Sequence, residues 1–331
     1  MLNKNLQLNP HVFDQDVEKT PIRNGFGDGL VEAAEKNKNV VGLCADLTES
    51  TRMEAFAKKF PERFIEIGIA EQNLASVASG MAVMGKIPFI SSYAMFSPGR
   101  NWEQIRTTIC YNDVGVKIAG SHAGVSVGPD GGTHQALEDI ALMRVLPNMV
   151  VICPCDVHEA RKATVVTSTD KKPTYIRLAR EKSPVITTKD TPFEIGRAYE
   201  FFRSGGEKAD VGIISTGVLT HQALLAAKQL DDEGIKVVLL HMPTVKPIDE
   251  DALKDIILDT GALVTVEEHQ VAGGLGSIVA EFASAFIPVP IEFVGVHNQF
   301  GQSGTPHELL NFYKLNTETI VKKAYKVLSR K

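Results

Sequence analysis

Short apolar runs rich in β-branched residues alternate along this chain with longer segments that have helical spacing. In the first half, the apolar runs lie at 39–45, 63–69, 86–92, 114–120, 148–154 and 173–180. In the second half they lie at 210–217, 236–243, 262–269 and 291–296, with predicted helices at 219–233, 249–259 and 276–286. Strands separated by helices are typical of parallel sheets, because a parallel connection must cross back over the sheet. The alternation therefore predicts an α/β chain with two domains, each a mostly parallel sheet flanked by helices.

A change of composition separates the two halves. Residues 183–195 are rich in Pro, Thr and charged residues and lack a helical period, which indicates a linker. We therefore expect an N-terminal extension at 1–20, a first domain at 21–182 and a second domain of four strands at 196–331. The length of 331 residues agrees with two domains.

Charge and hydropathy exclude several classes of protein. The formal net charge of −5 argues against a nucleic-acid-binding surface or a polybasic membrane contact. Apolar runs stay well below the ~18 residues that a membrane span needs, and the first residues lack the apolar segment of a signal peptide. Cys153 and Cys155 form a CxC pair, which is not the usual redox or zinc spacing. We expect ordinary thiols in a reducing, cytoplasmic environment.

Polar and aromatic side chains stand at the ends of four successive predicted strands. These residues are Asp46, Glu71, Tyr93 with the nearby Phe96, and His122. In open parallel sheets, ligands bind beyond the carboxyl ends of the strands, so we expect one shared cleft. Two alternatives stay open at this point. The aromatic residues suit core packing, and Asp46 or Thr48 suits the cap of a following helix.

The segment GSHAGVSVGPDGGTHQALEDIALMRVLPNM (120–149) places five glycines, two histidines and an acid before a predicted helix. Glycine lets the backbone approach a ligand closely. The segment presents His122, Asp130 and His134, and histidine transfers protons or donates hydrogen bonds near neutral pH. Zinc binding is disfavoured, because the two histidines lack a third clear ligand nearby.

Long motifs now resemble a known family. FPERFIEIGIAEQNLASVASGMAVMGKIPFISSYAMFSPGRNWEQIR, together with the 120–149 segment, resembles the pyrimidine-binding domain of transketolases. VTVEEHQVAGGLGSIVAE and HNQFGQSGTPHELL resemble the C-terminal domain of the same family. The resemblance runs from about residue 20 to the end. It implies a thiamine diphosphate enzyme that moves a two-carbon ketol unit from a ketose phosphate to an aldose phosphate.

On the cofactor side, the resemblance implies that Glu71 bonds the aminopyrimidine ring and acts in catalysis. It also implies that Tyr93 and Phe96 pack on this ring, and that Asp46 lies near the cofactor and a subunit contact. The alternative for Glu71 is a residue favoured at a helix N-terminus by the helix dipole.

On the substrate side, the resemblance implies that His122, Asp130 and His134 contact the hydroxyls and carbonyl of the sugar, with both histidines catalytic. It implies that Arg23 and Arg180 bind phosphate, for which a guanidinium fork is well shaped. A solvated surface position is the alternative for both arginines, and the favoured one for Arg177.

One motif of the family, which binds the cofactor diphosphate and magnesium, is not found in this sequence. Complete members carry a diphosphate-binding domain with a GDG…N magnesium motif, which this chain lacks. GFGDGL at 25–30 is followed by a window without Asn. We therefore predict a glycine-containing helix start there, and no metal ligands in this chain. The chain looks like the C-terminal subunit of a split transketolase, active only with an N-terminal, diphosphate-binding partner subunit that holds most of the Mg²⁺ contacts. An α2β2 heterotetramer is expected.

Three alternatives are compatible with parts of the sequence. The β subunit of a 2-oxo acid dehydrogenase E1 shares a GIAEQ-like motif, but its loop is organised differently from 128–149. A 1-deoxyxylulose-5-phosphate synthase normally carries its diphosphate domain in the same chain. A catalytically silent regulatory subunit is the non-enzyme alternative, and retention of Glu71 and both loop histidines argues against it. Gly132 stands where family members often have Pro, which suggests a looser loop and leaves the sugar phosphate preference open.

Overall fold

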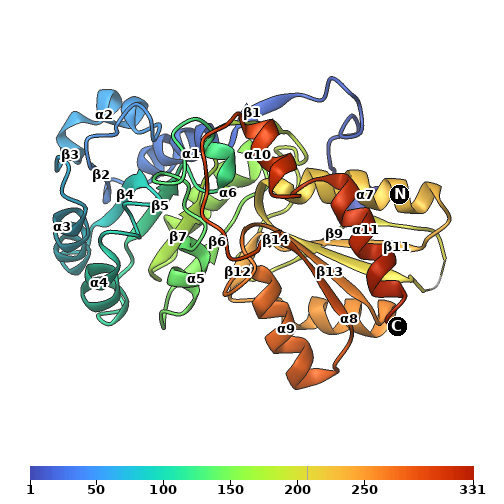
Figure 1. Ribbon diagram of the computed structural model, residues 1–331. Helices are drawn as coiled ribbons and strands as arrows, with labels where there is room; N and C mark the ends of the chain where they lie inside the picture. Colours follow the sequence, from blue (N-terminus) through green and yellow to red (C-terminus); the bar gives the residue numbers. More distant parts are fainter. Residues whose placement is uncertain (207) are drawn as a thin grey trace.

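The computed structural model describes residues 1–206 and 208–331, which form two sheet-centred domains side by side (Figure 1). The first sheet has the strand order β12-β6-β7-β5-β4-β2-β3, and the second has the order β14-β13-β10-β11-β9. Neighbouring strands are parallel except at β12 and β9, which join as antiparallel strands at the sheet edges. The predicted α/β fold with two mostly parallel sheets is confirmed.

The strands of the first sheet are β2 (Val40–Cys44), β3 (Phe64–Glu66), β4 (Ile87–Tyr93), β5 (Lys117–Ser121), β6 (Val150–Ile152), β7 (Thr174–Arg177) and β12 (Thr244–Lys246). Those of the second are β9 (Tyr199–Arg203), β10 (Val211–Ser215), β11 (Val237–His241), β13 (Leu263–Gln270) and β14 (Ile291–Val296). A separate antiparallel pair consists of β1 (Lys19–Pro21) and β8 (Lys182–Pro184). All ten predicted strands are present. The predicted count of four strands in the second sheet is wrong, because β9 adds a fifth.

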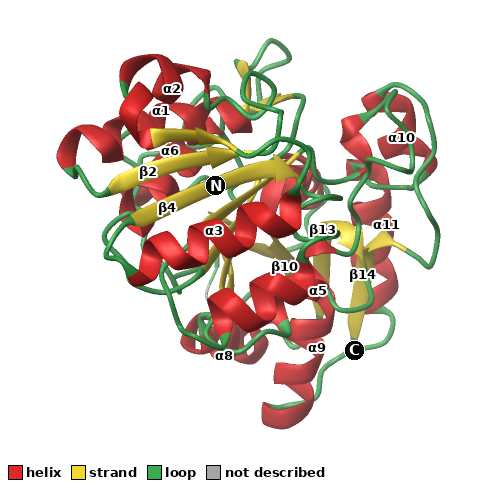
Figure 2. Cartoon of the chain, turned by 90° about the vertical axis from the view of Figure 1, so that its left-hand side faces the viewer, coloured by secondary structure: helices red, strands yellow, loops and turns green. Residues whose placement is uncertain are grey.

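Helices cover both faces of the first sheet. One face carries α1 (Ile22–Lys36), α2 (Glu54–Lys59) and α6 (Val157–Thr167). The other carries α3 (Glu71–Val83), α4 (Trp102–Gln104) with the π-helical turn η3 (Ile105–Cys110), and α5 (Asp139–Arg144). Figure 2 shows α3 on one side of β2 and β4, with α1 and α2 on the other. Successive residues of β2 alternate between the two cores, so the strand is apolar throughout.

The second sheet is covered in the same way. Helices α7 (Thr220–Asp232) and α11 (Thr317–Leu328) pack on one face, and α8 (Glu250–Thr260) and α9 (Leu275–Phe286) on the other. The short helix α10 (Pro306–Phe312) lies near the first domain (Figure 1). The N-terminal segment begins on the second domain, where Leu8 and Val12 join its core. No helix in the described residues is long and apolar enough to cross a membrane.

Two glycines let α1 pack directly against α6. A Cβ atom on Gly25 would lie 2.0 Å from the carbonyl oxygen of Val157, and one on Gly29 would lie 2.8 Å from that of Arg161. The segment 25–30 is therefore helical, as predicted, and its glycines serve helix packing.

The two domains are joined by more than a linker. Strand β12 leaves the second domain and extends the first sheet by pairing with β6. Asp156 accepts hydrogen bonds from the backbone N–H groups of Ile186 and Thr187, so the segment expected as a linker is held in place. Nearby, Glu159 accepts a 2.9 Å hydrogen bond from Nε2 of His241 and one from the backbone N–H of Cys155. Each of these contacts is buried, so the junction is a packed interior.

We expect Gly25→Ala to destabilise the chain by about 1–3 kcal/mol, because its Cβ would collide with rigid helix backbone. Urea unfolding followed by circular dichroism measures this. Gly80→Ala is the matched control: Gly80 also lies in a helix, but a Cβ there meets no atom within 4 Å. The control should be neutral or slightly stabilising. Equal stability of both variants would contradict the packing role of Gly25.

Candidate functional site

The strands that precede the candidate residues lie next to one another. Strands β5, β4, β2 and β3 are adjacent in the sheet and parallel, so their carboxyl ends meet at one edge. Glu71 opens α3 behind β3, Tyr93 is the last residue of β4, and His122 follows β5. The sheet therefore brings these three side chains to one edge, as the strand-end pattern indicates.

Glu71 is a buried carboxylate with one strong partner. Its side chain is 2% exposed, and its Oε2 accepts a 2.6 Å hydrogen bond from Arg100. The guanidinium carbon of Arg100 also lies 4.7 Å from the centre of the Phe96 ring. Among the described residues, no protein donor bonds to the other carboxylate oxygen, Oε1. Glu71 is thus anchored on one side and has an acceptor left on the other.

Four rings form an aromatic wall beside this carboxylate. Tyr93 stacks on His122 with 3.9 Å between ring centres, and on Phe96 with 6.0 Å. The ring of His134 stands edge-on to Phe96 at 5.4 Å. Tyr93, Phe96 and His134 are half-buried. They therefore line a surface-facing wall, and the core-packing alternative for Tyr93 and Phe96 is wrong.

Two arginine side chains place positive charge close to His122. Arg23 donates to the backbone oxygen of Ser50 at 2.6 Å and lies 3.4 Å from Nε2 of His122. Arg180 donates to the backbone oxygen of Val127 at 2.7 Å. Both arginines are half-buried, and the Nε–H of Arg23 has no acceptor among the described residues. Unpaired guanidinium donors in a partly desolvated site favour an anion.

Burial, together with the charges of Arg23 and Arg180, lowers the pKa of His122 to about 3. Desolvation disfavours the imidazolium ion, and neighbouring cations disfavour it further. His122 is therefore a neutral imidazole near pH 7. Its Nδ1 lies 2.9 Å from Oγ of Ser121, which orients the ring.

Two predicted site residues form no hydrogen bond with this group among the described residues. Asp46 is exposed, and its backbone N–H donates to Oε1 of Glu66 at 2.7 Å. Helix α2 begins only behind Met53, so neither Asp46 nor Thr48 caps it. Asp130 is exposed in the 128–134 loop, and its side chain forms no hydrogen bond with the described residues.

Two arginines were misjudged or missed by sequence reasoning. The favoured surface position for Arg177 is wrong, because Arg177 is buried and pairs with Asp139 at 2.8 Å. Arg100 was not among the candidates, although it contacts Glu71 directly. The sequence contains a feature that could have identified Arg100 as a candidate. It is the one charged residue in the sequence from 87 to 102.

Family models match both halves of the chain. The model of the transketolase pyrimidine binding domain matches residues 18–185, and that of the transketolase C-terminal domain matches residues 203–320.

Several individual relatives match over nearly their whole length. A putative transketolase C-terminal section from Methanocaldococcus jannaschii is 42% identical, covering 91% of this chain and 94% of the relative. The 6-deoxy-6-sulfo-D-fructose transketolase subunit SqwH from Clostridium sp. (strain MSTE9) is 38% identical, covering 96% and 98%. A solved structure of a split gene transketolase, described as an inactive beta4 tetramer, has a TM-score of 0.84 at 44% identity. It covers 94% of this chain, and this chain covers 99% of it.

We expect the imidazole signals of His122 to stay unchanged in NMR spectra between pH 8 and pH 5, since the ring protonates only near pH 3. The spectrum of His122→Asn identifies these signals. In Arg23→Met the pKa of His122 should rise, because one neighbouring cation is removed. A transition of the wild-type signals near pH 6.5 would contradict the desolvated, cation-flanked site.

Proposed function

Because the chain belongs to the transketolase family, we propose that it is one subunit of a thiamine-diphosphate-dependent enzyme that transfers a two-carbon ketol unit between sugar phosphates. It would contribute the pyrimidine-binding and C-terminal domains. The observation that carries this proposal is the buried carboxylate of Glu71 beside an aromatic wall, at the edge where four parallel strands end.

The surroundings of Glu71 fit an aminopyrimidine ring. Arg100 presents a flat guanidinium group that lies over the Phe96 ring and bonds the Glu71 carboxylate. A flat heteroaromatic ring bearing an N–H group can make the same two contacts, one by stacking and one by hydrogen bonding. Arg100 is about half exposed, so it can swing into solvent when such a ring binds.

These contacts support the roles that we propose for the cofactor-side residues. The bound cofactor supplies a nucleophilic carbon and an electron sink for the ketol unit. Glu71 would hold the aminopyrimidine ring by bonding its ring nitrogen through a carboxylate oxygen, and would share a proton at that atom. Tyr93 and Phe96 would pack against the ring and keep water from this contact.

The substrate-side residues bind and orient the sugar. Arg23 and Arg180 pair with the phosphate group, which would give the unpaired Nε–H of Arg23 an acceptor. His122 and His134 hydrogen-bond the carbonyl and hydroxyl oxygens, and His122 does so as a neutral ring. Asp130 would reach the sugar from the exposed loop.

The other half of the site would come from a second polypeptide. We propose that an N-terminal, diphosphate-binding subunit holds the diphosphate and the Mg²⁺, in an α2β2 assembly. The near-complete coverage of the M. jannaschii C-terminal section and of the SqwH subunit supports a two-chain enzyme. A cytoplasmic location is proposed as well, because all four cysteines are free thiols.

The identity of the sugar phosphates needs a direct assay. The chain is mixed with a diphosphate-binding transketolase subunit, thiamine diphosphate and Mg²⁺, and ketol transfer from xylulose 5-phosphate to ribose 5-phosphate is measured. We expect transfer only when both chains are present. A parallel assay with a sulfonated ketose tests the substrate class named for SqwH. Reductive acylation from a 2-oxo acid in place of ketol transfer would contradict the proposal. Full cofactor binding by this chain alone would contradict the divided site.

We expect Glu71→Gln to lower the rate of ketol transfer by about 100-fold or more, because the amide cannot share a proton with the ring nitrogen. Steady-state kinetics of the two-chain enzyme measures the change. Glu103→Gln is the control, since Glu103 is an exposed carboxylate on α4. Glu71→Gln activity within about threefold of wild type would remove Glu71 from its assigned role.

A further inference from the structure

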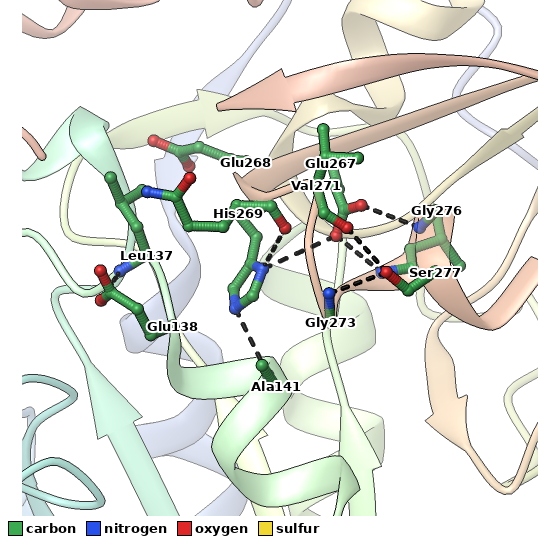
Figure 3. A network of polar contacts seen from close by, with 12 residues as sticks. Leu137, Glu138, Ala141, Glu267, Glu268, His269, Val271, Gly273, Gly276 and Ser277 are labelled. Carbon is green, nitrogen blue, oxygen red and sulfur yellow. Dashed lines mark hydrogen bonds and ion pairs between the residues drawn. The ribbon is translucent and has the colours of Figure 1, made fainter. Parts of the chain in front are cut away.

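Near its end, strand β13 of the second domain carries three consecutive buried ionisable residues, Glu267, Glu268 and His269. Because side chains alternate along a strand, Glu267 and Glu268 point in opposite directions (Figure 3). Glu267 turns toward its own domain, where it accepts hydrogen bonds from the backbone N–H groups of Leu275 and Gly276 at the start of α9. Glu268 turns toward the first domain.

Glu268 binds the turn that follows His122. Its Oε1 accepts a 2.6 Å hydrogen bond from the backbone N–H of Ser126, and its Oε2 accepts one of 3.2 Å from the Ser126 hydroxyl. Gly124 leaves room for this carboxylate: a Cβ there would lie 2.5 Å from both oxygens. Gly124 also has a φ of +88°, which favours glycine. Glycine at position 124 therefore allows both the conformation of the turn and the close approach of the Glu268 carboxylate.

The turn η4 (Val125–Val127) connects Glu268 to two candidate substrate residues. On one side, the carbonyl oxygen of Val127 accepts the 2.7 Å hydrogen bond from Arg180. On the other side, the chain leads back to His122, whose φ of +58° is unfavourable for a residue with a Cβ. Such a conformation persists only when its surroundings hold it.

A second contact from the same domain holds the far end of this loop. Nε2 of Gln135 donates to the carbonyl oxygens of Gln302 and Gly128, at 2.9 Å and 3.1 Å. A Cβ on Gly132 would lie 2.5 Å from the carbonyl oxygen of Gly301. Gly132 thus allows close cover by the second domain, and the expectation of a looser loop at this position stays a prediction.

We propose that Glu268 is a positioning residue: from the second domain it fixes the 125–127 turn, and through this turn it places His122 and Arg180 for the sugar phosphate. The inference rests on the proposed function, because substrate contact by these two residues is what makes their placement matter. It gives the second domain a role in the substrate half of the site.

Hydrogen–deuterium exchange of the full chain tests the contact without any assay of activity. Glu268→Leu keeps the volume of the side chain but removes both acceptors, so amides of 122–128 should exchange at least about tenfold faster than in wild type. Glu267→Leu is the matched control on the same strand. It should leave 122–128 unchanged and speed exchange at the start of α9. Unchanged exchange of 122–128 in Glu268→Leu, or equal acceleration in both variants, would overturn the proposal.

Kinetics of the two-chain enzyme tests the consequence. In Glu268→Leu we expect KM for the phosphorylated acceptor to rise on the order of tenfold, because His122 and Arg180 are misplaced. The affinity for thiamine diphosphate should stay as in wild type. Glu268→Gln, which keeps one acceptor oxygen, should show a smaller rise and covers the case in which the leucine variant fails to fold. An unchanged KM in both variants would overturn the role of Glu268. Absence of ketol transfer in wild type would refute the proposed function instead, and the exchange experiment would still decide whether Glu268 holds the turn.

Discussion

The buried ion pair between Arg177 and Asp139 is the contact on which the junction of the two domains depends. Arg177 ends β7, and Asp139 opens α5 directly behind the glycine-rich loop. The guanidinium also donates to the backbone oxygen of Glu268, and the hydroxyl of Tyr175 donates to the Asp139 carboxylate. Through these contacts, the Arg177–Asp139 pair connects β7 of the first sheet, helix α5 and the backbone of β13 in the second domain. Removing one partner from a buried pair typically costs about 3–5 kcal/mol, because the other charge is left without compensation.

The two sides of the candidate site are held in place by different parts of the chain. The contacts of Glu71, Arg100 and Phe96 lie within the first domain, between the start of α3 and the segment that follows β4. The loop that carries His122 is held from the second domain as well, by Glu268 of β13 and by the backbone of Gln302. The proposed cofactor side is thus built by one domain, whereas the proposed substrate side lies where the two domains meet. Under the proposed function, changes in the second domain would therefore alter substrate contacts without touching Glu71.

Local patterns in the sequence predicted much of the fold and part of the candidate site. Strands buried on both faces need continuous apolar runs, and ten of these runs were recognisable. Strands β1, β8, β9 and β12 were not, because they are short edge or bridging strands that form only when distant segments meet. The placement of Glu71, Tyr93 and His122 at neighbouring strand ends followed from parallel topology. Arg177 was misread as a surface residue, since its partner Asp139 lies 38 positions away.

The sequence by itself determined the parallel α/β architecture and the gathering of Glu71, Tyr93 and His122 at one edge, because local periodicity sets where strands end and which faces are apolar. Only the tertiary structure decided which polar groups pair. The Arg100–Glu71 contact joins two segments of the first domain, and the Glu268–Ser126 contact joins the two domains. The physical reason is the cost of burying unpaired polar groups: each must find a partner in the folded chain, and that partner can lie at any distance along the sequence.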